Sequence, residues 1–287
     1  MICELCPRRC GKRPGYCGAG DKPKVFRWGP HFGEEPPLVG EHGSGCVFFS
    51  RCTMRCVYCQ NSPWSWRGEG EEKSVEELAA ILRELAVGDK CENWNLVSPT
   101  PYLPFIREAV HNLAKEGVKL PIVWNSSGYE RTETLREYRE LCDFALFDLR
   151  YANDATALKY SAAPKYVETA RAALECVAGE LCGLDRTICR ILVLPGHHEE
   201  AIENLAWVAS TLGTDVMVSV MAQYTPAYLA QEIPPLNRKI TAGEYAEVSE
   251  AAADFGFERG WVQGLEAADP ELALLGENMP SGHASVR

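Results

Sequence analysis

Short apolar runs alternate with longer segments of helical periodicity along most of this chain. The apolar runs predict buried strands at residues 46–50, 93–98, 121–125, 143–149, 187–194 and 216–221. Amphipathic segments predict helices at about 74–86, 102–115, 132–141, 166–178, 199–212 and 242–255, with a further helical region from about 154. Residues 1–45 are rich in Gly, Pro and Cys and predict irregular structure, and the polar residues 62–73 predict a surface loop.

The alternation of strands with helices, about six times along the chain, predicts the fold class. Such an order is typical of βαβ units that form one parallel sheet, and right-handed crossovers would curl that sheet into an open or partial barrel. Polar residues at the strand ends would then gather on one rim. We therefore expect an α/β fold with a partial (β/α)6 barrel over residues 46–260, a Cys-rich extension over 1–45 and a tail over 261–287.

Composition and charge narrow the range of partners. The 287 residues are 46% hydrophobic and 24% charged, which is typical of a soluble globular protein. The net charge of −11 argues against nucleic acid as the main partner, although residues 1–30 carry a net charge of +5 that would suit an acidic partner or simply be solvated. No segment is apolar enough to cross a membrane, and no secretory signal follows Met1. Thirteen cysteines without an export signal indicate a reducing, cytoplasmic compartment and metal binding.

Cys52, Cys56 and Cys59 form a C-x3-C-x2-C pattern, called here the cysteine triplet. Three thiolates can hold three irons of a [4Fe-4S] cube and leave the fourth iron open, whereas an electron-carrier cluster normally takes four cysteines. An open iron can bind a substrate, so the pattern favours chemistry over electron storage. The alternatives are a structural zinc site or buried thiols, but zinc sites usually pair their cysteines as C-x2-C.

A second group, called here the N-terminal cysteine set, comprises Cys3, Cys6, Cys10 and Cys17. Four thiolates suffice for a closed site. Zinc would make it a structural staple, an iron–sulfur cluster would make it an electron relay, and reduced unliganded thiols are the third alternative. The other cysteines lack ligand spacing and are expected in the core: 46, 91, 142, 176, 182 and 189.

The cysteine triplet and several further motifs occur in an order that resembles the radical S-adenosylmethionine (SAM) superfamily, and within it the pyruvate formate-lyase activating enzyme-like branch. The resemblance covers about residues 3–260 and is carried by Ser50 to Asn61, Asn95 to Thr100, Pro121 to Glu130, Lys159 to Ser161, Val193 to Gly196 and Met221 to Tyr224. It implies that the triplet holds a [4Fe-4S] cluster whose open iron binds SAM. One electron would then cleave SAM to methionine and a 5'-deoxyadenosyl radical, which abstracts hydrogen from a substrate.

The resemblance also implies roles for residues at the strand ends. Tyr58 would pack near the adenine of SAM, or serve only as a core aromatic. Ser98 and Thr100 stand where relatives often have the Gly-Gly-Glu segment that binds the SAM amino group, or they cap the next helix. The remaining candidates are Asn125 and Ser127 for the ribose or methionine part, the pair Asp148 and Arg150 (otherwise a surface ion pair), and Arg190 and His197 for the SAM carboxylate or substrate.

Partners follow from the same resemblance. An electron donor such as flavodoxin or ferredoxin would reduce the cluster, and the substrate would be a Gly of a partner glycyl-radical enzyme. The alternatives are a small molecule or another peptide as substrate, or a non-catalytic iron–sulfur or zinc protein. Two residues depart from the expected pattern: Arg51 stands where a Gly usually precedes the first cysteine, and Pro101 stands where we expect a His.

Overall fold

The structure is a computed structural model that describes residues 3–265. Within this part of the chain, nine strands form one sheet in the order β3-β1-β2-β4-β5-β6-β7-β8-β9. β1 pairs antiparallel with both β2 and β3. All the other neighbouring strands, from β2–β4 to β8–β9, pair in parallel. The strands are β1 (Lys24–His31), β2 (Ser44–Phe49), β3 (Glu71–Glu72), β4 (Trp94–Val97), β5 (Ile122–Ser126), β6 (Phe144–Asp148), β7 (Thr187–Leu192), β8 (Met217–Met221) and β9 (Gly260–Val262).

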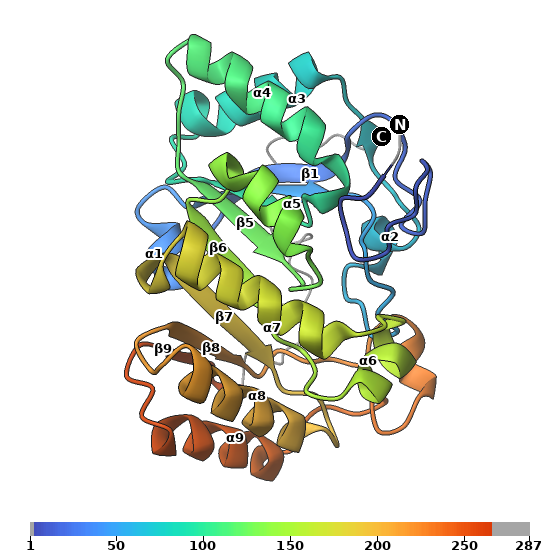
Figure 1. Ribbon diagram of the computed structural model, residues 1–287, viewed down its shortest axis with the longest axis vertical. Helices are drawn as coiled ribbons and strands as arrows, with labels where there is room; N and C mark the ends of the chain where they lie inside the picture. Colours follow the sequence, from blue (N-terminus) through green and yellow to red (C-terminus); the bar gives the residue numbers. More distant parts are fainter. Residues whose placement is uncertain (1–2, 266–287) are drawn as a thin grey trace.

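Helices connect the parallel strands and cover the outer face of the sheet (Figure 1). They are α3 (Val75–Arg83), α4 (Leu103–Lys115), α5 (Thr132–Glu137), α6 (Asp154–Ser161), α7 (Tyr166–Cys176), α8 (His198–Thr211) and α9 (Ala242–Asp254). The described residues also form two short helices, α1 (Pro36–Val39) and α2 (Ser62–Ser65). This is the α/β architecture that the alternating pattern predicted, with the sheet order of a partial barrel. Among residues 3–265, no helix is long and apolar enough to span a bilayer.

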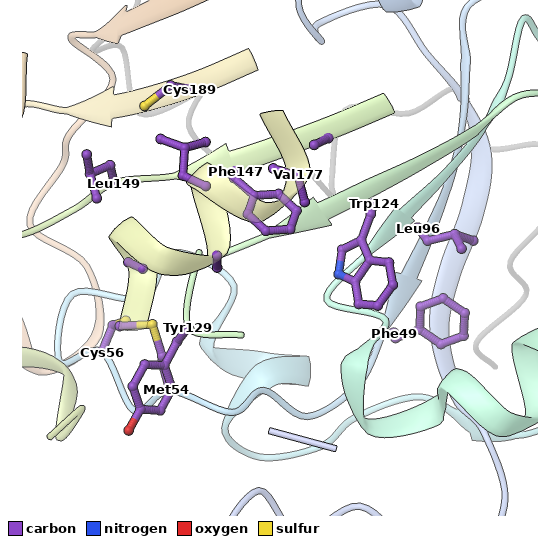
Figure 2. Packing of buried hydrophobic residues seen from close by; sticks show 14 of the residues in the cluster. Phe49, Met54, Cys56, Leu96, Trp124, Tyr129, Phe147, Leu149, Val177 and Cys189 are labelled. Atoms are coloured by element: carbon purple, nitrogen blue, oxygen red, sulfur yellow. The ribbon is translucent and has the colours of Figure 1, made fainter. Parts of the chain in front are cut away.

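The two faces of the sheet bury different sets of side chains. On the outer face, strand residues such as Phe49, Leu96 and Trp124 share one large apolar cluster with the helices (Figure 2). On the inner face, Leu38 of α1 packs with apolar residues at the amino end or in the middle of four strands: Val123, Leu146, Ile188 and Met217. Burying these side chains contributes about 1.5–3 kcal/mol each. Helix α1 therefore closes the amino end of the barrel, and only the carboxyl ends of the strands remain for a site.

Most predicted elements are present, with shifted ends. The helix predicted from residue 74 begins with a capping box, in which Ser74 and Glu77 exchange side-chain and backbone hydrogen bonds at the start of α3. The predicted helices ending at 86 and 178 leave α-geometry earlier and continue as π-helices, Glu84–Gly88 and Val177–Leu181. β9 lies across the boundary expected at residue 260, and residues 266–287 of the expected tail lie outside the described residues.

Two predictions of irregular structure were wrong. Residues 1–45 contain β1, which pairs with β2 along its length and is interrupted by an irregularity between Val25 and Arg27. Gly29 and Pro30 within β1 obscured it, because both residues usually mark turns. Residues 62–73 contain α2 and the short edge strand β3 rather than only a loop.

Candidate active site

A cavity opens at the carboxyl ends of the parallel strands and encloses about 1090 Å³, its open mouth included. All three sulfur-bearing residues of the cysteine triplet line it. The predicted polar residues from three neighbouring strands and the turn after a fourth line the same space: Ser98, Asn125, Ser127, Asp148, Arg150 and Arg190. The structure therefore brings together residues that lie up to 138 positions apart in the sequence.

Backbone hydrogen bonds fix the loop that carries the cysteine triplet between β2 and α2. The N–H groups of Arg55 and Val57 donate to the carbonyls of Ser161 (2.9 Å) and Tyr160 (2.8 Å) at the end of α6. The indole N–H of Trp66 donates to the carbonyl of Cys56 at 3.1 Å. Since these partners come from distant parts of the chain, the folded barrel holds the loop in place.

Hydrogen-bond donors surround the three sulfur atoms. Cys56 Sγ accepts from the hydroxyl of Ser161 at 3.0 Å and from the guanidinium of Arg150 at 3.4 Å. Cys59 Sγ lies 3.0 Å from Ser65 Oγ. The backbone N–H of Met54 points at Cys52 Sγ from 3.5 Å. Donors of this kind favour a charged sulfur, which is the form that binds a metal.

Burial opposes that charge in the absence of a cation. Burial and the nearby Cys56 sulfur raise the pKa of Cys52 to about 11 and that of Cys59 to about 12. Bound iron would offset both effects, because metal binding stabilises thiolates. The residues present thus fit a cluster held by three thiolates. Among residues 3–265, no three His, Cys, Asp or Glu side chains are arranged as ligands of a single metal ion.

A charged network lies beside the triplet at the ends of β6 and β7. Asp148 Oδ2 accepts from Arg150 at 2.5 and 3.0 Å, and Asp148 Oδ1 accepts from Arg190 at 2.7 Å. Arg190 also donates to Asn125 Oδ1 at 2.8 Å. Burial disfavours the Asp148 charge, but the charges of Arg190 and Arg150 outweigh it and hold the pKa of Asp148 below its usual value. Asp148 is only 5% exposed, so the alternative of a surface ion pair is wrong.

The turns after β4 and β5 form the neighbouring wall. Ser98 adopts φ 57°, and its N–H donates to the Asn125 carbonyl at 2.9 Å. Thr100 does not line the main cavity; it lines a small void beside it together with Cys52 and Ser98. The side chain of Thr100 donates to Glu130, so it does not cap α4. Tyr166 fixes the turn after β5, because its hydroxyl donates to the carbonyl of Ser127 at 2.9 Å.

Tyr58 is a buried aromatic at the edge of the cavity. Its ring lines the cavity and packs 5.8 Å from the ring of Tyr224, measured between centroids. Its hydroxyl lies 2.6 Å from that of Tyr151, which in turn lies 2.5 Å from Ser161 Oγ. Tyr58 is therefore a buried aromatic whose polar end connects through Tyr151 and Ser161 to Cys56.

Sequence reasoning missed two buried acids. Glu130 is 2% exposed and accepts from the hydroxyls of Thr100 (2.5 Å) and Ser126 (2.6 Å), and burial raises its pKa to about 7 despite those bonds. Glu34, in the segment that connects β1 to α1, lines the cavity, and its carboxylate lies 3.9 Å from the Arg190 guanidinium. Glu130 lies at the end of the segment Pro121 to Glu130, which carries part of the family resemblance, but nothing in the local pattern marked Glu34.

Other candidate residues lie away from the cavity. His197 precedes α8 and contacts Glu200 (3.2 Å) and Tyr160 (3.3 Å) without lining the cavity. The N-terminal cysteine set is likewise absent from the cavity lining. Its Cys6 and Cys17 are buried, and Cys3 and Cys10 are partly exposed.

The two residues that depart from the expected pattern each have defined local contacts. Arg51 adopts φ 76°, a conformation that favours glycine, which accounts for the Gly expected there. The Arg51 guanidinium donates to the Trp66 carbonyl at 3.0 Å and lies against Gly68, where a Cβ would approach within 2.3 Å. Pro101 lies in a 3₁₀ turn, and its carbonyl accepts from Arg13 at 2.6 Å.

Comparisons with known proteins agree with this geometry. A family model described as the radical SAM superfamily matches residues 46–206, which is more than half of the chain. The chain is 28% identical over 271 residues to MJ0674, an uncharacterized protein of Methanocaldococcus jannaschii. That match covers 89% of this chain and 75% of the relative.

Two solved structures share the fold at low sequence identity. SuiB of Streptococcus suis bound to its precursor peptide SuiA has a TM-score of 0.52 and 14% identity, and the match covers 78% of this chain. HydG, a maturase of the [FeFe]-hydrogenase, has a TM-score of 0.50 and 9% identity over 79% of this chain. The match spans only about half the length of each of these two proteins, 49% and 53%.

Proposed function

Because the chain belongs to the radical SAM superfamily, we propose that the cysteine triplet binds a [4Fe-4S] cluster and that the cavity binds SAM beside it. One observation carries the proposal: the three sulfurs and the polar ends of four strands line one cavity. When bound, the cluster supplies the electron that cleaves SAM and generates the 5'-deoxyadenosyl radical. The chain itself supplies binding, orientation and protection from solvent.

The charged network at the ends of β6 and β7 would orient SAM. Arg150 contacts both Asp148 and the Cys56 sulfur, so its positive charge would be available to the methionine carboxylate of SAM. Two hydrogen bonds hold the Asn125 side chain: Arg190 donates to its amide oxygen, and its amide N–H donates to Asn95. This bracing leaves the Asn125 amide a fixed partner for the ribose or methionine part. Tyr58 would bound the adenine side.

Glu130 would be a positioning residue, because it holds Thr100 and Ser126 and does not itself line the main cavity. One oxygen of its buried carboxylate accepts from Thr100 after β4 and from Ser126 at the end of β5. It therefore ties together the two turns that present Ser98 and Ser127 to the cavity. In the absence of a Gly-Gly-Glu segment, the carbonyls and hydroxyl of the turn that begins at Ser98 would receive the SAM amino group.

The proposed substrate is a segment of polypeptide, and a Gly of a partner glycyl-radical enzyme is the specific candidate. The open mouth of the cavity supports this, since an extended loop could enter it. The fold shared with SuiB, which was solved with its precursor peptide, supports a peptide substrate more generally. A reduced flavodoxin or ferredoxin is the proposed electron donor. The N-terminal cysteine set is proposed as a second metal site.

The test is anaerobic reconstitution with iron and sulfide, followed by reduction and addition of SAM in deuterium oxide. The wild-type chain should release 5'-deoxyadenosine, Cys56→Ala should release none, and the matched control Cys182→Ala should behave as wild type. With a glycyl-radical enzyme present, electron paramagnetic resonance should show a glycyl radical. With a peptide substrate instead, deuterium or a new bond should appear in the peptide. Wild-type chain that carries a full cluster but forms no 5'-deoxyadenosine would overturn the proposal.

A further inference from the structure

A row of three buried hydroxyl groups leads from the wall of the cavity to one of the triplet sulfurs. The hydroxyls of Tyr58 and Tyr151 lie 2.6 Å apart, and the hydroxyl of Tyr151 lies 2.5 Å from Ser161 Oγ. Ser161 Oγ in turn donates to Cys56 Sγ at 3.0 Å. We call Tyr58, Tyr151 and Ser161 the hydroxyl chain. It joins the loop of the cysteine triplet to the segment after β6 and to the last residue of α6.

The direction of each hydrogen bond in the hydroxyl chain follows from Cys56. A cysteine that binds iron is a thiolate without a proton, so Ser161 is the donor in that contact. A hydroxyl has one proton and two lone pairs. The oxygen of Ser161 therefore accepts from Tyr151, whose oxygen accepts from Tyr58. All three protons point toward the sulfur, and in such a series each hydrogen bond polarises and strengthens the next.

Packing keeps the hydroxyl chain rigid and away from solvent. Ser161 and Tyr151 are fully buried, and Tyr58 is 3% exposed. The ring of Tyr151 meets that of Tyr166 edge-on at 5.3 Å between centroids, and the ring of Tyr58 packs on that of Tyr224. The backbone carbonyl of Ser161 also accepts an N–H from the triplet loop at 2.9 Å. The Ser161 hydroxyl is thus fixed beside the sulfur, in surroundings of low polarity where a hydrogen bond is strong.

The place of this hydroxyl matters for an electron that enters a bound cluster. Reduction adds one negative charge to the cluster, and part of that charge lies on the sulfurs. Burial disfavours the added charge. A donor to Cys56 Sγ acts in the opposite direction, because it stabilises the reduced state more than the oxidised one. Hydrogen bonds to the sulfurs are among the features that set the reduction potential of an iron–sulfur cluster.

We propose that the hydroxyl chain raises the reduction potential of the triplet cluster by stabilising its reduced state through Cys56. In the step concerned, one electron passes from a reduced electron-donor protein to the bound cluster, and no covalent bond forms or breaks. Ser161 is the positioning residue, and Tyr151 and Tyr58 act through it. The inference rests on the proposed function for the presence of the cluster. If the three hydroxyls served only to satisfy one another in the core, their removal would lower stability without changing the potential.

The experiment is an anaerobic redox titration of the reconstituted protein without SAM, followed by the electron paramagnetic resonance signal of the reduced cluster. At the wild-type midpoint potential, Ser161→Ala should lower the ratio of reduced to oxidised cluster about tenfold, which is about 59 mV for one electron. The triple variant Tyr58→Phe, Tyr151→Phe, Ser161→Ala should shift equally, and it leaves no buried hydroxyl without a partner. The matched control Tyr245→Phe removes a buried hydroxyl that donates to the carbonyls of Val220 and Gln263, and should keep the wild-type ratio.

Iron and acid-labile sulfide are measured first in each protein, so that the two proposals fail separately. Loaded variants whose ratio changes less than about threefold, or rises, would overturn this inference alone, as would an equal shift in Tyr245→Phe. Failure of both hydroxyl-chain variants to bind the cluster would show that the hydroxyls assemble the site rather than set its potential, and would also overturn it. A wild-type chain that binds no cluster would overturn the proposed function and this inference with it.

Discussion

Replacing Glu130 with Gln removes a buried carboxylate whose ionisation the fold opposes. Burial raises its pKa from an ordinary 4.5 to about 7, even though Ser126 and Thr100 donate to it. Between these two values the folded chain keeps a proton that the unfolded chain has released, so this group lowers stability as the pH rises. From about pH 5 to about pH 8 the loss amounts to roughly 2–3 kcal/mol. The amide introduced by Glu130→Gln would keep an acceptor oxygen without titrating.

The assay is thermal unfolding of the metal-free chain under anaerobic reducing conditions at a series of pH values. The difference in Tm between Glu130→Gln and wild type should shift in favour of the variant by about 5 °C between pH 5 and pH 8. Any pH-independent effect of the substitution cancels in that comparison. Glu108→Gln, at an exposed position on α4, should give a curve parallel to wild type. If the Glu130→Gln difference stays constant across this range, the carboxylate is not penalised by burial and our reasoning is wrong.

Three further predictions use the same structure. Asp148→Asn should destabilise the chain by about 3–5 kcal/mol, since it leaves Arg150 and Arg190 buried without their anion; a change in the free energy of unfolding below about 1 kcal/mol would contradict it. Ser74→Ala should cost about 1 kcal/mol through loss of the α3 capping box, measured by denaturant unfolding, and Ser74→Asp should restore most of it. Gly68→Ala should destabilise by at least about 1 kcal/mol, because position 68 has φ 71° and the added Cβ meets the Arg51 guanidinium; wild-type stability of the variant would show that Arg51 moves freely.

Local patterns predicted the parallel part of the fold because its strands are short apolar runs buried on both faces. They did not predict β1, whose register is set by pairing with β2 and whose Gly29 and Pro30 read as a turn. Nor did they show where α3 and α7 change to π-geometry, because apolar residues such as Leu85 continue the helical pattern into the π-segments.

Site residues could be predicted where they share a local motif or where they stand at the ends of parallel strands. The cysteine triplet is local, and the order of parallel strands placed Asn125, Asp148 and Arg190 at the same rim. Glu34 escaped prediction because only the packing of α1 under the barrel brings its carboxylate into the cavity. The bond between Glu130 and Thr100 joins residues 30 positions apart, and no local pattern reports such a contact. The roles proposed for the cavity residues remain predictions.

The central claim is that three cysteine sulfurs leave a reactive iron open to SAM in this cavity. The most direct measurement is 5'-deoxyadenosine released by the reduced, cluster-loaded chain after addition of SAM, quantified by mass spectrometry. We predict release by wild type and by Cys182→Ala, and none by Cys56→Ala. Release by Cys56→Ala at the wild-type rate, or no release by a wild-type chain with a complete cluster, would contradict it.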